Sequence, residues 1–216
     1  KQTQFLMQLK KQPTDLLNRF ILTFFLTSFL GVGITVRAAE ERVHLFAVMN
    51  KGDDLGHLKI IEKPTPAQTS YHYVMDMTTS VLFKKIHVQY NMDAVYKKGQ
   101  LMNYHLIYRL NDRLVDDITL KWIGEKYSIV SQKGTNEHLK KIRYSTIRLF
   151  CKEPVNRSSV WGELICENSD LSKIEDGHYR VTFNSRKFND YFYEKGQLIR
   201  ASINTALMSF EMFRVN

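Results

Sequence analysis

The sequence lacks the short motifs that mark common catalytic and cofactor sites. No serine lies in a Gly-x-Ser-x-Gly turn, which argues against the nucleophile elbow of the α/β-hydrolases. The seven histidines are scattered singly, without the His-x-His or His-x-x-x-His spacing of familiar metal sites. The closely spaced glycines of Gly31-Val32-Gly33 fall inside an apolar leader segment and indicate no phosphate loop. We therefore predict no catalytic residues, no bound metal and no cofactor.

A block of basic residues is also missing. The formal net charge is +9, from 31 Lys and Arg against 22 Asp and Glu. Residues 1–38 hold five of the basic side chains and one acid, so the rest carries 26 basic and 21 acidic residues, a net of +5. The lysine pairs Lys84-Lys85, Lys97-Lys98 and Lys140-Lys141 are isolated from one another. This spread of charge is typical of a solvated surface, and we expect no nucleic-acid partner.

Cysteine is scarce, since Cys151 and Cys166 are the only two. Neither lies near the end of the leader, which excludes bacterial lipoprotein acylation there. In an exported protein the two could form a disulfide, and a loop of this size would gain about 3 kcal/mol from it. Each cysteine also follows a pair of apolar residues, so two buried reduced thiols are the alternative. The sequence leaves both open, because it does not fix the Cα separation that a disulfide needs.

A charge-free apolar run covers residues 20–36 and follows several basic residues. This order is typical of a secretion signal. Val36-Arg37-Ala38 offers small residues at the two positions that signal peptidase reads, so cleavage falls between Ala38 and Ala39. We predict a signal peptide over residues 1–38 and export to the periplasm or cell envelope. A retained inner-membrane anchor is the alternative, and it would be the protein's one contact with the membrane.

After the leader, apolar and polar side chains alternate with a period of two, which indicates strands with one buried face. Short turns such as Asn111-Asp112 separate these runs. Short connections imply antiparallel neighbours, because a parallel crossover needs about a dozen residues or more. The apolar faces of the clearest runs are Tyr71, Tyr73, Met75 and Met77; Ile86, Val88, Tyr90, Met92, Ala94 and Tyr96; and Met102, Tyr104, Leu106, Tyr108 and Leu110.

The sequence therefore predicts one all-β domain over residues 39–216, preceded by an N-terminal hydrophobic leader helix. About ten mostly antiparallel strands must coil to cover their apolar faces, as a barrel, a half-barrel or a sandwich. Residues 139–150 fit either a strand or a short helix. The segment Val95–Leu101 is echoed by Phe192–Leu198, which indicates two hairpins with the same glycine turn or, alternatively, a duplicated half-domain.

Turn and packing residues recur in a recognisable order in Phe46–Gly56, Ile86–Leu101, Trp122-Ile123-Gly124, Tyr144-Ser145, Leu149-Phe150, Glu153-Pro154 and the set Tyr191, Tyr193, Gly196 and Leu198. In these segments the chain resembles an uncharacterised family of exported bacterial all-β proteins, a domain of unknown function with half-barrel or lipocalin-like architecture. The likeness spans nearly all of residues 42–216, and the chain departs from the family at Asn111-Asp112, where Asn-Gly is usual, and in the two cysteines. The resemblance implies fold and export and no activity.

Two functions from different classes remain. The first is a binding or carrier module for a lipid or small apolar ligand, similar in architecture to half-barrel lipoprotein carriers. The second is a hydrolase on a β scaffold, for which Glu153 and Glu163 are a candidate carboxylate pair, although Glu153 more simply ends a segment before Pro154. Ordinary core packing is the alternative role of the candidate ligand-binding residues, which are Tyr71, Tyr73, Met75, Tyr90, Met92 and Tyr104.

The leader gives the first testable prediction. We expect the exported protein to begin at Ala39, because the basic flank, the apolar run and Val36-Arg37-Ala38 together form a cleavable signal. Amino-terminal sequencing of protein recovered from the cell envelope measures the start. Recovery of a chain that still carries residues 20–36 would establish the anchored alternative.

Overall fold

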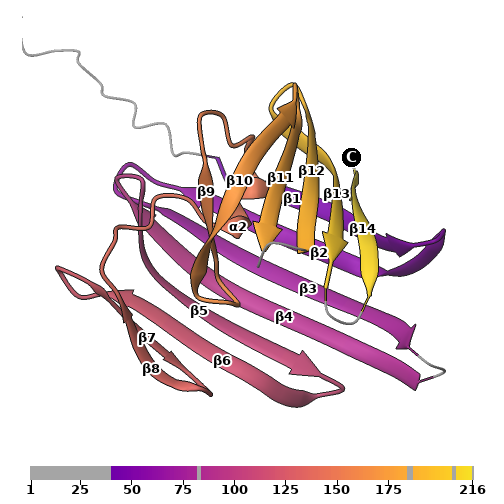
Figure 1. Ribbon diagram of the computed structural model, residues 1–216, viewed down its shortest axis with the longest axis horizontal. Helices are drawn as coiled ribbons and strands as arrows, with labels where there is room; N and C mark the ends of the chain where they lie inside the picture. Colours follow the sequence, from indigo (N-terminus) through magenta and orange to yellow (C-terminus); the bar gives the residue numbers. More distant parts are fainter. Residues whose placement is uncertain (1–39, 82–83, 184–186, 206–207, 216) are drawn as a thin grey trace, which may run out of the picture. The chain divides into compact units, whose positions relative to one another are not determined.

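The computed structural model describes residues 40–81, 84–183, 187–205 and 208–215 (Figure 1). The predicted leader helix and the cleavage site at Ala38 and Ala39 lie outside these residues. Within the described residues, fourteen strands form one antiparallel sheet. The strands are β1 (Arg42–Asn50), β2 (Asp53–Pro64), β3 (Thr69–Val81), β4 (Lys84–Lys97), β5 (Gln100–Leu110), β6 (Arg113–Trp122), β7 (Tyr127–Ser131), β8 (Gly134–His138), β9 (Ser159–Gly162), β10 (Glu167–Glu175), β11 (His178–Phe183), β12 (Lys187–Glu194), β13 (Gln197–Asn204) and β14 (Ser209–Val215).

The sheet consists of two meanders joined side by side. Strands β1 to β8 follow one another in order, strands β9 to β14 do the same, and β1 pairs with β14 in between. The antiparallel all-β fold is therefore confirmed, with more strands than the ten or so predicted. Short strands account for the difference, since β8 has the sequence GTNEH, which carries no alternating apolar face.

The sheet is open, because β8 and β9 form its two edges. In Figure 1 the orange and yellow strands β10 to β14 run at a steep angle to the purple and magenta strands β2 to β6. The inner faces of both groups contribute to one hydrophobic core. Of the three predicted forms, this arrangement corresponds to a half-barrel, because a single sheet curls around its own core.

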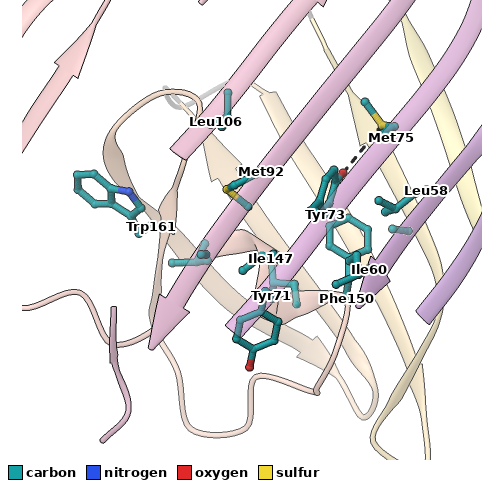
Figure 2. Close-up of a cluster of buried hydrophobic side chains, with 14 of the residues drawn as sticks. Leu58, Ile60, Tyr71, Tyr73, Met75, Met92, Leu106, Ile147, Phe150 and Trp161 are labelled. Carbon is teal, nitrogen blue, oxygen red and sulfur yellow. Dashed lines mark hydrogen bonds between the residues drawn. The ribbon is translucent and has the colours of Figure 1, made fainter. Parts of the chain in front are cut away.

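The long hairpin of β3 and β4 shows the predicted inner face. Tyr71, Tyr73, Met75 and Met77 are all buried on β3, and Tyr73 pairs directly with Met92 on β4. Cross-strand partners share one face of a sheet, so the two strands present one continuous apolar surface. Figure 2 shows Tyr71, Tyr73 and Met75 among the other buried side chains of this core.

The two echoed segments form hairpins with the same turn. Lys98 and Gly99 have φ values of 48° and 75°, and Lys195 and Gly196 have values of 49° and 77°. Two consecutive positive φ angles define a type I′ turn, for which glycine at the second position is favoured. The same geometry occurs at the predicted turn Asn111-Asp112, with values of 47° and 63°.

Each echoed hairpin also contains a bulge at the same place. Tyr96 pairs with Leu101, but the next pair joins Val95 to Asn103, so Met102 is the extra residue. Met102 is consequently only half-buried and Leu101 takes the fully buried position, which corrects the predicted inner face of this strand. The register of β12 and β13 shifts in the same way beyond Tyr193 and its partner Leu198.

The segment that joins the two edges of the sheet crosses the inside. It contains α2 (Thr146–Leu149), so the ambiguous residues 139–150 include one short helix. The amide of Leu101 donates to the carbonyl of Ile142 at 2.9 Å, and the amide of Trp161 donates to the carbonyl of Tyr144 at 3.0 Å. The segment therefore bonds to both halves of the sheet. Among the described residues, no helix has the length and apolar character that a bilayer span requires.

Aromatic side chains close the gap between the edge strands. His138 on β8 lies against Trp161 on β9, with ring centroids 4.6 Å apart, and the ring centroid of Tyr127 lies 6.1 Å from that of His138. Burial and the charge of Lys140 lower the pKa of His138, so its ring is neutral and suited to stacking. We call this row the edge seam. It joins by packing two strands that no ladder of hydrogen bonds connects.

The edge seam gives a stability prediction. Trp161 is completely buried, so Trp161→Ala should lower the free energy of unfolding by about 3–5 kcal/mol, the usual cost of removing a buried aromatic ring. Ile174→Ala is the matched control, because Ile174 is 50% exposed and its removal should cost at most about 0.5 kcal/mol. Urea unfolding measures both. Equal losses in the two variants would contradict a role of the seam in stability.

Candidate ligand-binding cavity

A cavity of about 480 Å³ lies between the two halves of the sheet. Its walls come from β3, β4 and β5 on one side and from β11 to β14 on the other. The turn between β9 and β10 and both ends of α2, at Thr146 and Phe150, complete the lining. Small-molecule sites typically have volumes of about 300–1,000 Å³ and mainly apolar walls. The size and lining of this cavity match such a site.

The floor of the cavity is aromatic. Phe150, which ends α2, makes edge contacts with Tyr73 and with Tyr191, each with ring centroids 6.0 Å apart. The hydroxyl of Tyr73 donates to the sulfur of Met75 at 3.9 Å, and Figure 2 shows this contact beside Phe150. Burial raises the pKa of Tyr73, so the phenol stays neutral. The floor therefore presents uncharged rings and a polarisable sulfur.

The mouth of the cavity is marked by lining residues that reach the surface. Ile165 in the turn between β9 and β10 is 45% exposed. Phe183 at the end of β11 and Met208 just before β14 are half-buried, whereas Tyr73 and Tyr191 are buried. The cavity thus runs from the buried floor to an opening at the ends of β11 and β13.

One carboxylate lies in the wall. Glu163 is 1% exposed, and its Oε1 accepts a hydrogen bond from the amide of Ile147 at 3.1 Å. Its Oε2 accepts from the amide of Thr146 at 3.2 Å and from the hydroxyl of the same residue. These amides belong to the first turn of α2, where a helix has donors without internal partners. Glu163 therefore serves as the cap of α2.

Burial raises the pKa of Glu163, although the hydrogen bonds from Thr146 and from the amide of Ile147 favour the ionised form and oppose this. The other candidate carboxylate, Glu153, accepts a hydrogen bond from the hydroxyl of Tyr179 at 2.9 Å. Burial, followed by that hydrogen bond, raises the pKa of Tyr179 to about 12. Both carboxylates are thus engaged in structural hydrogen bonds.

Half of the candidate ligand-binding residues line the cavity. Tyr73, Met75 and Tyr90 do so. Met92 and Tyr104 are buried in the core outside the lining, and the hydroxyl of Tyr104 donates to the carbonyl of Glu163 at 2.9 Å. Tyr71 lines a separate hollow, and its hydroxyl donates to Glu62 at 3.2 Å.

Sequence patterns did not single out several lining residues. Leu164 and Ile165 lie in a turn, and Asn189 is a buried polar residue on the inner face of β12. Tyr191 was recognised only as part of the family resemblance. The one usable signal was its spacing from Tyr193, since residues two apart share a face of a strand.

The two cysteines are free thiols with different partners. The thiol of Cys151 donates to the carbonyl of Ile147 at 3.6 Å. The thiol of Cys166 lies 3.6 Å from the carbonyl of Glu163 and 3.4 Å from the hydroxyl of Tyr104. Burial raises the pKa of both cysteines.

Three potential metal ligands lie together beneath β1 and β2. Nitrogen, oxygen and sulfur atoms of His44, Glu62 and Cys151 are all within 4.8 Å of one another. Arg214 donates to Nδ1 of His44 at 3.0 Å, which places the imidazole proton on Nε2, 3.5 Å from Glu62. A metal would need the lone pair of Nε2 and an acceptor at Nδ1. The donors around His44 therefore suit a neutral histidine and a carboxylate, not a bound cation.

Several other histidines form pairs with acids of neighbouring strands. His72 lies 2.8 Å from Asp93, and His105 lies 2.8 Å from Asp117. These pairs are exposed and no third catalytic group joins them in the described residues. They resemble ordinary cross-strand side-chain pairs, which contribute modestly to stability.

The comparisons with known proteins concern the whole sheet. The family model described as "Domain of unknown function (DUF6134)" matches residues 46–215. The crystal structure of a beta-barrel-like protein of the domain of unknown function DUF1849 from Brucella abortus is similar, with 10% identity and a TM-score of 0.48. That match covers 82% of this chain and 95% of the other. No curated protein matches the chain. The resemblance to an uncharacterised all-β family is confirmed by the match to the family model.

Glu163 gives a pH-dependent prediction. Its pKa in the folded protein is raised above the ordinary value of 4.5, so its contribution to stability falls as the pH rises through the interval between the two values. Glu163→Gln removes this contribution. The stability of the wild type relative to the variant should therefore fall with rising pH, by at most about 1.4 kcal/mol per pH unit.

Urea unfolding from mildly acidic to mildly alkaline pH measures this difference. Thr146→Val is the companion variant, because it removes a donor to the ionised carboxylate and should extend the fall to higher pH. Parallel stability curves for the wild type and Glu163→Gln would contradict the raised pKa.

Proposed function

The chain belongs to this family of the domain of unknown function DUF6134, and we propose that it is a binding or carrier module for a small apolar or lipid-like ligand. The observation that carries the proposal is the cavity of about 480 Å³ with its apolar and aromatic lining. A core packed for stability alone rarely leaves a space of this size.

The identity of the lining supports the same ligand class. Four methionines, Met75, Met77, Met208 and Met212, line the cavity. Methionine has a flexible and polarisable side chain that adapts to ligands of varied shape. Tyrosine hydroxyls such as that of Tyr90 add polar contacts without charge, since burial raises the pKa of Tyr90 well above its ordinary value.

The proposal includes the site of action. A leader with a cleavable signal over residues 1–38 would deliver the domain to the periplasm or cell envelope, where lipids and other apolar molecules need carriers. If the leader were retained, residues 20–36 would hold the same cavity at the membrane surface.

Hydrolysis is the second candidate, and the raised pKa of Glu163 in the cavity wall favours it. A general acid or base must reach the proton that it transfers. Both oxygens of Glu163 instead accept hydrogen bonds from Thr146 and Ile147, and the side chain is 1% exposed. Binding is therefore the better-supported function.

Titration with an uncharged naphthylamine dye, whose fluorescence rises in apolar surroundings, tests the proposal. We expect saturable binding of one dye per chain. Met208→Trp should fill the mouth and weaken dye binding by about tenfold, because Met208 is a half-buried lining residue. Native mass spectrometry of the purified protein should also detect co-purified lipid.

Phe213→Trp is the matched control. Phe213 lies on β14 outside the cavity lining and is 38% exposed, so the added ring should leave dye binding unchanged. Absence of saturable binding, or equal weakening by both variants, would contradict ligand binding in the cavity.

A further inference from the structure

A second hollow, of about 460 Å³, lies at the start of β3 and the end of β4. Its walls come from these two strands, the loop between β2 and β3, the turn between β4 and β5, and α2. It shares no residue with the lining of the apolar cavity. Two cations, Lys98 and Arg148, line it, and no carboxylate does so among the described residues. We call it the Arg148 hollow.

The guanidinium of Arg148 is held in place without an acidic partner. Its central carbon lies 5.1 Å from the ring centroid of Tyr96 and 5.2 Å from that of Tyr144. Its Nη1 donates to the carbonyl of Arg143 at 3.0 Å, the one hydrogen bond of this side chain within the described residues. Three other arginines form ion pairs with acids, whereas Arg148 forms none in the part of the chain that the structure describes.

This arrangement prepares the guanidinium for an anion. Arg148 is half-buried, and a charge that has lost part of its water is normally paired. Its position is fixed, because Glu163 caps the first turn of α2 and the hydroxyl of Tyr96 bonds to Ser145 just before that turn. The planar fork of a guanidinium matches the two oxygens of a carboxylate or phosphate. A side chain that is already ordered loses less entropy when a ligand binds.

Other residues of the lining add donors around the same space. Lys98 is exposed and begins the type I′ turn between β4 and β5. Gln68 and Thr69 are half-buried, and their side chains make no hydrogen bond within the described residues. The loop that carries Gln68 is ordered, since the hydroxyl of Thr65 accepts from the Gln68 amide at 3.1 Å and donates to its carbonyl at 2.9 Å. An ammonium, an amide and a hydroxyl therefore accompany the guanidinium.

The acids beside the hollow have other partners. Glu62 accepts a hydrogen bond from Tyr71 and pairs with Arg42 at 3.5 Å. Glu163 is 1% exposed and bonded to α2. A further cation, Arg157, lies 5.5 Å from the centroid of the same tyrosine ring, at position 144, that Arg148 contacts. The hollow therefore has a positive potential, which attracts anions.

We infer that the Arg148 hollow binds a small organic anion, whose carboxylate or phosphate accepts hydrogen bonds from Arg148 and lies beside Lys98. The volume of about 460 Å³ is within the range of small-molecule sites and many times the space of one water, so the ligand has an organic body beyond its charged group. The site is separate from the apolar cavity, and the inference does not rest on the proposed function.

Four probes that share one benzene ring separate the charge from the body. Benzoate and phenyl phosphate are anions, benzyl alcohol is neutral and benzylamine is a cation. Titration of the ¹⁵N-labelled full chain, followed by NMR, reports binding at the amides of Gln68 and Gly99 and at the Nε–H of Arg148. We expect saturable shifts with both anions, at affinities at least about tenfold above that of benzyl alcohol, and none with benzylamine. The tighter of the two anions identifies the charged group.

Variants locate the site. Arg148→Gln should weaken binding of the anions by about tenfold or more, because it removes a charged bidentate donor. Lys98→Gln should weaken it by about threefold, since an exposed charge contributes less, and this exposed turn position leaves the packing intact. Lys195→Gln is the matched control, because Lys195 occupies the same position of the echoed turn, with φ 49° against 48°, and lies outside the lining. It should bind as the wild type does.

Three outcomes would overturn the inference. One is equal affinity for benzoate, phenyl phosphate and benzyl alcohol, which would mean that the hollow does not recognise charge. Another is equal weakening by Lys98→Gln and Lys195→Gln, which would mean that the anions bind the basic surface without a specific site. The third is the absence of shifts at Gln68, Gly99 and Arg148 with either anion. Since Lys98→Gln does not touch the core, its result stands even if Arg148→Gln fails to fold.

Discussion

The carboxylate of Glu163 accepts hydrogen bonds from the first turn of α2. These bonds fix the position of α2, and the packing inside the sheet depends on that position. A helix of four residues has little stability of its own, so side chains must fix it. The two echoed hairpins also hold α2 in place. The hydroxyl of Tyr96 bonds to Ser145 at 2.6 Å, just before α2, and the hydroxyl of Tyr193 donates to the carbonyl of Leu149 at 2.7 Å, at its end. Three contacts from three places in the chain thus orient one turn of helix.

The position of α2 then decides the shape of the space beside it. Phe150 follows the helix directly and packs against Phe46 on β1 as well as against Tyr73 in the floor of the cavity. If α2 were displaced, Phe150 would leave the floor and the aromatic contacts that end the cavity would separate. The same crossing segment bonds to Leu101 and to Trp161, so it also supports the edge seam. The segment that crosses the interior therefore stabilises the half-barrel as much as the hydrogen bonds of the sheet do. The cavity is the part of the interior that α2 does not fill.

Local patterns in the sequence predicted the parts of this structure that local rules govern. The alternation from Tyr71 to Met77 gave the correct buried face, and Asn111-Asp112 gave a turn. The edges and the capping of α2 depend on distant partners. No local pattern predicts that GTNEH forms strand β8, because its side chains are mostly exposed. Glu163 caps α2 only because the folded sheet places it beside Thr146, which is distant in sequence. The same reason explains the cavity: Met75 and Tyr90 could be recognised as inward-facing, but whether the space before them is filled depends on how β11 to β14 cross them. Met92 is equally apolar and also faces inward, but it is packed in the core outside the cavity lining.

The pairing of β1 with β14 has a consequence for how the chain acquires its fold. Arg214 and His44 are 170 residues apart in sequence, yet they are in contact within the middle of the sheet. Until β14 has been synthesised, β1 presents an unpaired edge, and the first meander remains an open ribbon with a wet inner face. Contacts across so long a loop form late and make folding slow. A nascent chain would therefore stay incompletely folded until its final strand arrives, which is the state that a chain must keep if it is to be threaded through a narrow translocation pore.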